Sequence, residues 1–172
     1  MTVIAVDKDP TACTMRITAE YDAPVEQVWR LWSDPRLLER WWGPPTYPAT
    51  VDAHDLTPGG HVAYHMTGPD GDEPRGWWKV LVVDPPRRLE LEDGFAHADG
   101  APNLDMPTMQ IRVDIRPVDG GARMSVTTAF PSPEAMEQML TMGMDEGMSL
   151  AVSQIDGILA ELATTPEVGH RA

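Results

Sequence analysis

Apolar and polar side chains alternate between residues 14 and 21 of the chain. Met15, Ile17, Ala19 and Tyr21 fall on one face, and the positions between them hold Arg, Thr and Glu. A period of two is typical of a β-strand that buries one face and exposes the other. We therefore predict a half-buried strand over 14–21.

The period changes at residue 25, where apolar side chains begin to recur three and four positions apart. Val25, Val28, Trp29 and Trp32 carry this spacing, which predicts a helix with one buried face. The Ser-Asp-Pro sequence at 33–35 interrupts the helix. A second short helix follows and ends at the next Gly-Pro-Pro sequence.

Six further strand-like runs follow, separated by turns that are rich in Gly, Pro and Asp. They span residues 49–56, 61–67, 76–83, 88–95, 108–116 and 122–130. The Asp-Gly-Gly sequence at 119–121 is a strong signal for a tight hairpin between the last two runs. No helix lies between these strands, so we expect them to pair in an antiparallel sheet.

One long amphipathic helix is expected from residue 132 to residue 163. Its apolar stripe is rich in methionine and contains Gly143 and Gly147, each of which costs about 1 kcal/mol relative to Ala in a helix. Such glycines mark close packing, a bend or space for another molecule. We expect flexible tails at 1–12 and 164–172, on either side of a single domain at 13–163.

The order of the elements predicts an α+β fold. A first strand is followed by two short helices, six strands and the long C-terminal helix, without the alternation of strands and helices that builds a parallel sheet. We expect a curved, seven-stranded antiparallel sheet around the long helix, so that each element buries one face against the other.

The composition limits the classes of partner. The chain has 172 residues, with 27 acidic and 13 basic residues and a formal net charge of −14. Nucleic acids and anionic membranes attract basic surfaces, so we predict no nucleic-acid and no membrane partner. Neither a membrane span nor a signal peptide is expected, which favours a cytoplasmic protein. A single cysteine, Cys13, excludes an intramolecular disulfide.

Several motifs together resemble the SRPBCC (START-like) superfamily. The sequence RITAEYDAPVEQVW at 16–29 is similar to the opening of these domains. RWWGP at 40–44, followed by DLTPGG at 55–60, is similar to the branch named after the activator of the 90-kDa heat-shock protein ATPase. The resemblance covers 13–163, and further motifs that continue it lie at 68–71, 84–89 and 142–147.

The resemblance implies a helix-grip fold with a cavity between the sheet and the C-terminal helix. The common property of the superfamily is the binding of a small hydrophobic molecule in that cavity, and some relatives carry out cyclisation or hydrolysis there. The name of the branch implies a different role, as an interaction module that activates a chaperone ATPase. Members of the branch share no catalytic motif, so the resemblance assigns no catalytic residue.

Methionines and aromatic residues indicate where a binding surface would lie. Four of the six Trp fall within 29–42, and five of the eleven Met fall within 136–148. Methionine is flexible and polarisable and lines pockets that accept varied apolar ligands, although core packing alone explains any one of these residues. The predicted ligand-binding residues are Trp32, Tyr64, Met66, Trp78, Met109, Ile111, Met124, Met136, Leu140, Met144 and Met148.

Other chemistry has less support in the sequence. Three histidines and a carboxylate within 52–65 could hold zinc, but they alternate with the apolar residues of the inner face, so we predict no metal and no cofactor. Acid–base catalysis would need a polar group such as Tyr64 or His97 in the cavity. No known catalytic motif is present, so the sequence favours a binding protein and leaves an enzyme, and also a homodimer, open.

Overall fold

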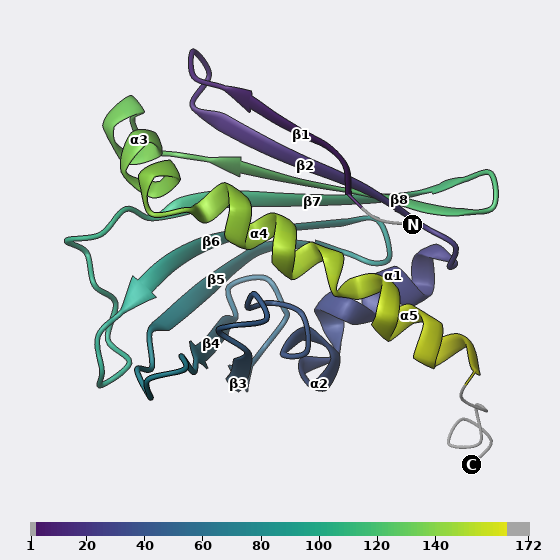
Figure 1. Ribbon diagram of the computed structural model, residues 1–172, viewed down its shortest axis with the longest axis horizontal. Coiled ribbons are helices and arrows are strands. Elements are labelled where there is room, and N and C mark those ends of the chain that lie inside the picture. The colour runs from purple at the N-terminus through teal and green to yellow at the C-terminus, as the bar shows by residue number, and fades with distance from the viewer. Residues whose placement is uncertain (1–2, 165–172) are drawn as a thin grey trace.

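The computed structural model describes residues 3–164 of the chain, which form one strongly curved antiparallel sheet with helices on its concave side (Figure 1). The sheet has eight strands in the order β1-β2-β8-β7-β6-β5-β4-β3. Their bounds are β1 (Val3–Asp9), β2 (Thr14–Tyr21), β3 (Ala49–His54), β4 (His61–Met66), β5 (Arg75–Asp84), β6 (Arg88–Ala96), β7 (Met109–Val118) and β8 (Gly121–Ala129). The predicted α+β helix-grip fold is thus confirmed, and each of the seven predicted strands is present.

The sheet contains one strand more than predicted. Residues 1–12 were expected to form a flexible tail, but Val3–Asp9 pairs with β2 as the edge strand β1. The pairing shifts register between Val3 and Ala5, and residues 5–9 are half-buried or exposed, so the strand lacks the alternation of buried and exposed positions that would have revealed it. Lys8 and Asp145 also form an ion pair of 2.6 Å, which links β1 to the helical layer.

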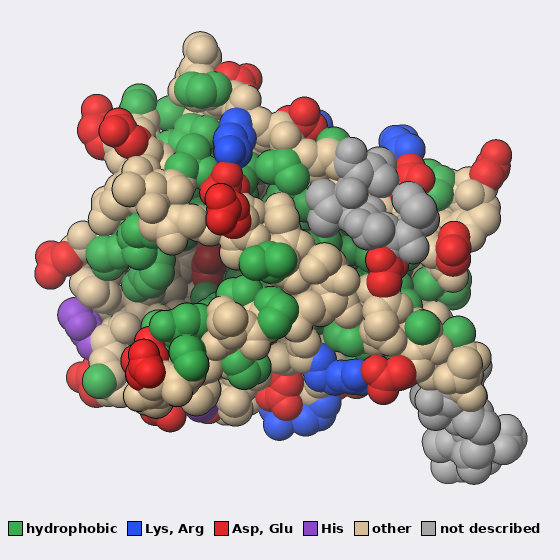
Figure 2. All heavy atoms as spheres, in the orientation of Figure 1, with side chains coloured by type: hydrophobic (Ala, Val, Ile, Leu, Met, Phe, Trp, Pro, Cys, Tyr) green, Lys and Arg blue, Asp and Glu red, His purple; other side chains and the backbone are tan. Residues whose placement is uncertain are grey.

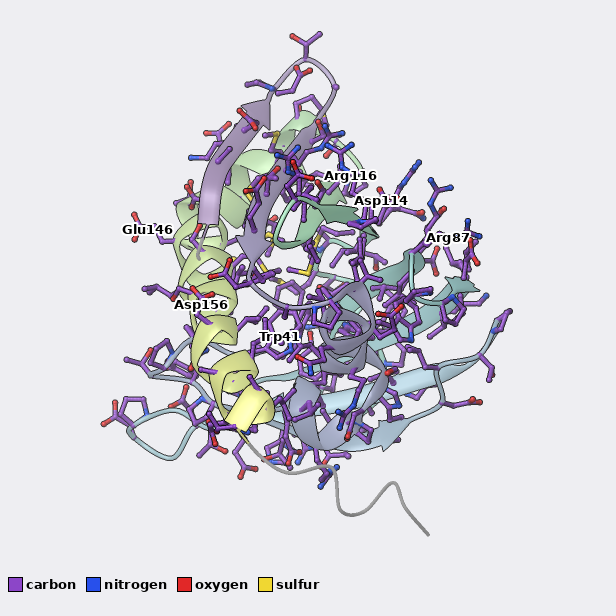
Figure 3. The ribbon with its side chains drawn as sticks, turned by 90° about the vertical axis from the view of Figure 1, so that its right-hand side faces the viewer. Trp41, Arg87, Asp114, Arg116, Glu146 and Asp156 are labelled. Carbon is purple, nitrogen blue, oxygen red and sulfur yellow. The ribbon has the colours of Figure 1, made fainter. Side chains whose placement is uncertain are left out.

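Two helices between β2 and β3 close one end of the sheet. These are α1 (Val25–Ser33) and α2 (Pro35–Leu38), and the side chain of Asp34 caps α2 by accepting from the backbone N–H of Arg36. Trp41, which follows α2, is fully buried and donates its indole N–H to the Leu31 carbonyl at 3.0 Å. Figure 3 shows Trp41 between the C-terminal helices and α1.

The C-terminal helix is divided into three segments, not one continuous helix as predicted. They are α3 (Pro133–Thr141), α4 (Met144–Ser153) and α5 (Ile155–Thr164). Gly143 has a φ of +86°, in the left-handed region that favours glycine, and this residue ends α3 and redirects the chain into α4. In Figure 1, α4 and α5 follow each other across the sheet while α3 is set at an angle to them. Residues 165–172 of the predicted C-terminal tail lie outside the described residues.

The core lies between the concave face of the sheet and the helices. At its centre four buried indoles pack edge to face or tilted, with ring centroids 4.8–6.0 Å apart. They are Trp32, Trp41, Trp42 and Trp78. Within residues 3–164, no helix has the length and apolar character needed to cross a membrane.

Candidate functional site

A pocket of about 180 Å³ lies between the concave side of the sheet and the segments α3 and α4. The space-filling view shows a hollow on this face of the molecule, with hydrophobic side chains at its rim (Figure 2). The pocket is lined by Trp42, Pro44, Tyr64, Met66, Asp93, Phe95, Met109, Met139, Met144, Gly147 and Met148.

The periods of the elements explain how these side chains meet. Tyr64 and Met66 share the inner face of β4, and Asp93 and Phe95 share that of β6, because alternate residues of a strand point to the same side. On α4 the lining positions are three and four residues apart, which places them on one face of that helix. A Cβ atom added at Gly147 would meet no heavy atom within 4 Å, so the missing side chain leaves open space there.

One polar pair lies in this apolar wall. The Tyr64 hydroxyl donates a hydrogen bond to Oδ1 of Asp93 at 3.0 Å, and both residues are buried. Tyr64 lies opposite Gly76 in the β4–β5 pairing, and a Cβ atom at that glycine would come within 2.3 Å of the tyrosine ring. The glycine therefore leaves the space that allows Tyr64 to lie flat over β5 and reach Asp93.

Burial strongly perturbs the acid–base properties of the pair. Loss of solvent raises the pKa of Asp93 to about 7, against the opposing influence of the Tyr64 hydroxyl and the Trp78 indole. Burial, and then the charge of Asp93, raises the pKa of Tyr64 well above its usual value near 10. The tyrosine therefore stays neutral at physiological pH, whereas Asp93 exchanges its proton near neutrality.

Two indole N–H groups beside the pair have no hydrogen-bond partner. Nε1 of Trp78 and Nε1 of Trp42 are both buried without an acceptor in hydrogen-bond geometry. The Trp78 indole nevertheless favours the ionised form of Asp93, and the Trp42 indole that of Tyr64. The donors around Asp93 therefore suit a carboxylate better than a neutral carboxylic acid.

Five of the predicted ligand-binding residues meet in this pocket, namely Tyr64, Met66, Met109, Met144 and Met148. Four others, which are Trp32, Trp78, Ile111 and Met124, are at most 2% exposed and belong to the core. Their packing is tight, since the Trp32 indole N–H lies 3.3 Å from the sulfur of Met124. These four positions support the wall of the pocket from behind.

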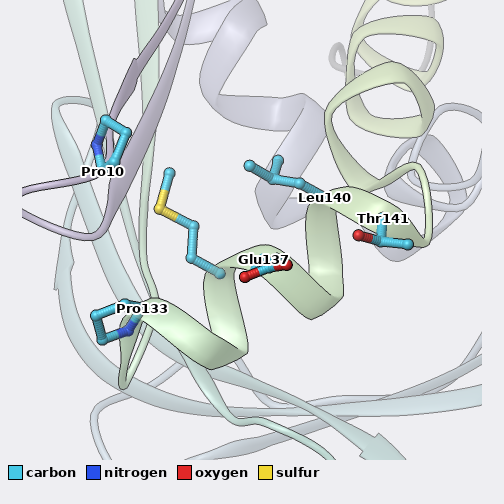
Figure 4. Close-up of a pocket in the computed structure, with 6 residues that line it drawn as sticks. Pro10, Pro133, Glu137, Leu140 and Thr141 are labelled. Carbon is cyan, nitrogen blue, oxygen red and sulfur yellow. The ribbon is translucent and has the colours of Figure 1, made fainter.

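The remaining two predicted residues, Met136 and Leu140, face a different hollow. This second hollow of about 500 Å³ lies at the rim, between the turn after β1 and α3, and Pro10, Pro133, Glu137 and Thr141 complete it (Figure 4). These four residues are exposed, so the hollow is a surface groove. The two residues are four positions apart on one face of α3, which fronts the groove, whereas Met139 of the same helix lines the pocket.

Six residues of the pocket wall are not among the predicted ligand-binding residues, namely Trp42, Pro44, Asp93, Phe95, Met139 and Gly147, although Gly147 had been expected to mark close packing, a bend or space for another molecule. A signal for Asp93 was nevertheless present. The residue continues the inner face of β6 after Leu89 and Leu91, which are both buried. A carboxylate at an apolar position of a strand is the kind of mismatch that marks a functional group.

None of the four histidines in the described part of the chain lines the pocket. His65 pairs with Asp52 at 2.8 Å, and His54 shares a hydrogen bond of 3.1 Å with the Trp32 carbonyl. His97 is exposed on the loop after β6, so it does not supply the acid–base group considered above. Within the described part of the chain, no cluster of three or more His, Cys, Asp or Glu is arranged to hold a metal ion.

Fold and pocket together define a helix-grip domain of the SRPBCC type, a class that commonly binds hydrophobic ligands. More specifically, residues 22–160 match the family described as activator of Hsp90 ATPase homolog 1-like protein, and the chain belongs to this family. No protein of curated function matches the chain.

Solved structures of the same architecture come from several bacteria. A solution structure of a protein from Arthrobacter aurescens is 47% identical, with a TM-score of 0.90 and 99% of each chain covered. A crystal structure of a protein from Mycobacterium smegmatis is 45% identical, with a TM-score of 0.85 and coverage of 96% of this chain and 99% of that one. A protein from Staphylococcus epidermidis is 26% identical, with a TM-score of 0.80 and coverage of 95% and 98%.

Proposed function

We propose that this protein binds a small, largely apolar molecule in the pocket between the sheet and α3–α4. The observation that carries the proposal is the wall itself, in which methionines and aromatic rings from both layers surround an open volume of about 180 Å³. Ligand sites are typically concave and apolar with a few placed polar groups, and the Tyr64–Asp93 pair supplies such groups.

The methionines suit a ligand site because they can adapt to different shapes. Met66, Met109, Met139, Met144 and Met148 line the pocket, and an unbranched thioether side chain changes rotamer at low cost. The aromatic residues behind and beside them are fixed by the Trp cluster. The site thus combines a rigid aromatic wall with an adaptable methionine wall.

Filling the pocket from within tests this proposal. Gly147→Leu adds four carbons at a position on α4 where nothing lies within 4 Å, and should abolish saturable binding of apolar ligands. Gly157→Leu on α5 is the matched control, because that glycine is also helical and unobstructed but exposed and outside the pocket. Binding is followed by intrinsic tryptophan fluorescence, to which Trp42 in the pocket wall contributes, and by native mass spectrometry of freshly purified protein.

The two variants give opposite expectations. Wild type and Gly157→Leu should take up apolar probes of one-ring size saturably, and Gly147→Leu should not. Equal binding by all three proteins would place the ligand elsewhere, and the absence of saturable binding or of a co-purifying molecule in wild type would contradict the proposal.

An acid–base enzyme that uses the same pocket is a second candidate. The observation in its favour is the buried Asp93, whose pKa of about 7 is suited to accepting and returning a proton at neutral pH. In that case Asp93→Asn should abolish turnover while apolar substrates still bind. Interaction with a chaperone ATPase and homodimerisation stay predictions, for which pull-down with and without nucleotide and sedimentation are the tests.

A further inference from the structure

We propose that the preferred ligand of this pocket is a cationic amine on a small apolar body, held between the Asp93 carboxylate and the aromatic rings. This inference rests on the proposed function and specifies the chemical class of its ligand. The geometry that supports it is a lone carboxylate within an apolar wall that also contains aromatic side chains.

The carboxylate has no countercharge in the pocket. Among the described residues that line the pocket, Asp93 is the only one whose side chain ionises near neutral pH, and no Lys, Arg or His is present there. A buried charge is stable only when it is paired and hydrogen-bonded. Tyr64 supplies a hydrogen bond to one oxygen, and a cation is the component that the site lacks.

The described groups that face Asp93 from each neighbouring element are uncharged at neutral pH. It faces Tyr64 on β4, the Trp78 indole on β5 and Met109, its partner on β7. The segments α3 and α4 face the pocket with methionines and a glycine, and the loop after α2 does so with Trp42 and a proline. Among these groups, only Tyr64 titrates, far above neutral pH.

The acidic residues of α4 do not provide a competing charge in the pocket. Asp145 is paired with Lys8 of β1 at 2.6 Å. The side chain of Glu146 points away from the sheet (Figure 3). The field inside the pocket therefore comes from Asp93, and it attracts a cation and repels an anion.

Aromatic rings favour the same kind of ligand. Trp42 and Tyr64 both line the pocket, and their ring centroids are 5.9 Å apart in an edge-to-face arrangement, with Phe95 at the same wall. The face of an aromatic ring attracts a cation within about 6 Å, more strongly when the cation is desolvated. The carboxylate and the rings therefore both attract an ammonium group. An anionic ligand such as a fatty acid would instead be repelled by Asp93.

The volume sets the size of the ligand. A cavity of about 150 Å³ holds benzene in another protein, whereas drug-sized ligands need roughly 300–1,000 Å³. At about 180 Å³ the pocket suits one ring with a short amine-bearing arm. The net charge of −14 also favours the approach of cations over anions.

A series of three one-ring ligands that differ in charge tests the proposal on the wild-type protein. Benzylamine is a cation at pH 8, benzyl alcohol is neutral and benzoate is an anion, and calorimetric titration gives the affinity for each. We expect benzylamine to bind at least about tenfold more tightly than benzyl alcohol, which corresponds to roughly 1.4 kcal/mol, and benzoate to bind most weakly.

Variants and pH provide two independent checks. Asp93→Asn should bring benzylamine and benzyl alcohol to within about twofold, whereas Glu137→Gln, which removes one charge at the surface groove, should keep the preference. In wild type the affinity for benzylamine should fall by up to about tenfold per pH unit below pH 7, as Asp93 takes up its proton, while that for benzyl alcohol stays constant. The pH series does not depend on the folding of any variant.

Each result is decisive. If benzyl alcohol binds saturably and benzylamine binds no more tightly, the amine inference fails and the proposed function stands. A benzylamine preference that persists in Asp93→Asn also overturns the inference, because the preference then arises elsewhere. If none of the three ligands binds and no molecule co-purifies, both the inference and the proposed function fail.

Discussion

The buried carboxylate should make the stability of the protein depend on pH in a way that a single substitution removes. Asp93→Asn keeps the shape of the side chain and an oxygen that can accept from the Tyr64 hydroxyl, but it carries no charge at any pH. The difference in free energy of unfolding between wild type and this variant therefore isolates the ionisation of Asp93, since all other titrating groups are common to both proteins.

The sign and size of this pH dependence follow from the raised pKa of Asp93. In the folded protein the pKa of Asp93 is about 7, compared with an ordinary value of 3.8. The folded state therefore holds the proton between these values while the unfolded state has lost it, so stability falls as the pH rises through this window. At about 1.4 kcal/mol for each pH unit the full loss is about 4 kcal/mol, of which about 3 kcal/mol falls between pH 5 and pH 8.

Urea denaturation followed by circular dichroism at half-unit steps of pH measures this difference. The free energy of unfolding of wild type should fall by about 3 kcal/mol relative to that of Asp93→Asn between pH 5 and pH 8. The difference between the two proteins should be constant above pH 8. A flat difference across the whole range would show that Asp93 is solvated or paired in solution, and would refute the reasoning. If wild type instead gained stability relative to Asp93→Asn as the pH rises, a cation would already lie beside the carboxylate.

Three glycine substitutions test the local geometry, each by its effect on the urea midpoint. Gly147→Ala should stabilise the protein by about 0.5–1 kcal/mol, because α4 is helical there and nothing lies near the added methyl group; a loss of stability would show that the space is filled. Gly143→Ala should destabilise it by about 1–2 kcal/mol, since the φ of +86° suits only glycine without strain; no change would place the end of α3 elsewhere. Gly76→Ala should cost about 1–3 kcal/mol by displacing the Tyr64 ring, and should also weaken binding to the pocket, whereas unchanged binding would contradict the position given to that ring.

Much of the fold could be predicted because its strands have one buried and one exposed face. The inner positions of β2 and β7 alternate without interruption, and Gly120 marks the hairpin after β7 with a positive φ. β1 escaped prediction because residues 6–9 of this edge strand are all exposed, so no such alternation is present. The break at Gly143 escaped because apolar residues recur at helical spacing on both sides of it, so periodicity alone shows one continuous helix where the backbone forms separate segments.

The candidate site was predictable only in part, for a related reason. Periodicity identifies which residues face inward, and it placed Tyr64 and Met109 there correctly. It does not distinguish an inward residue that meets another side chain from one that meets open space. Met124 and Met144 both face inward, yet the first contacts the Trp32 indole and the second lines the pocket. That distinction depends on the angle between α3 and α4 and on the missing side chain at Gly147.

Asp93 connects the stability of the protein to the ligand that we propose. The same free energy appears in three observables, because the cost of ionising a buried carboxylate raises its pKa, lowers stability as the pH rises from 3.8 to about 7 and is offset by any cation that binds beside it. A cationic ligand should therefore stabilise wild type more at pH 8 than at pH 5, whereas a neutral ligand should stabilise it equally at both. The free energy that wild type loses relative to Asp93→Asn between pH 5 and pH 8 thus measures the cost of ionising the buried carboxylate, which a bound cation would offset.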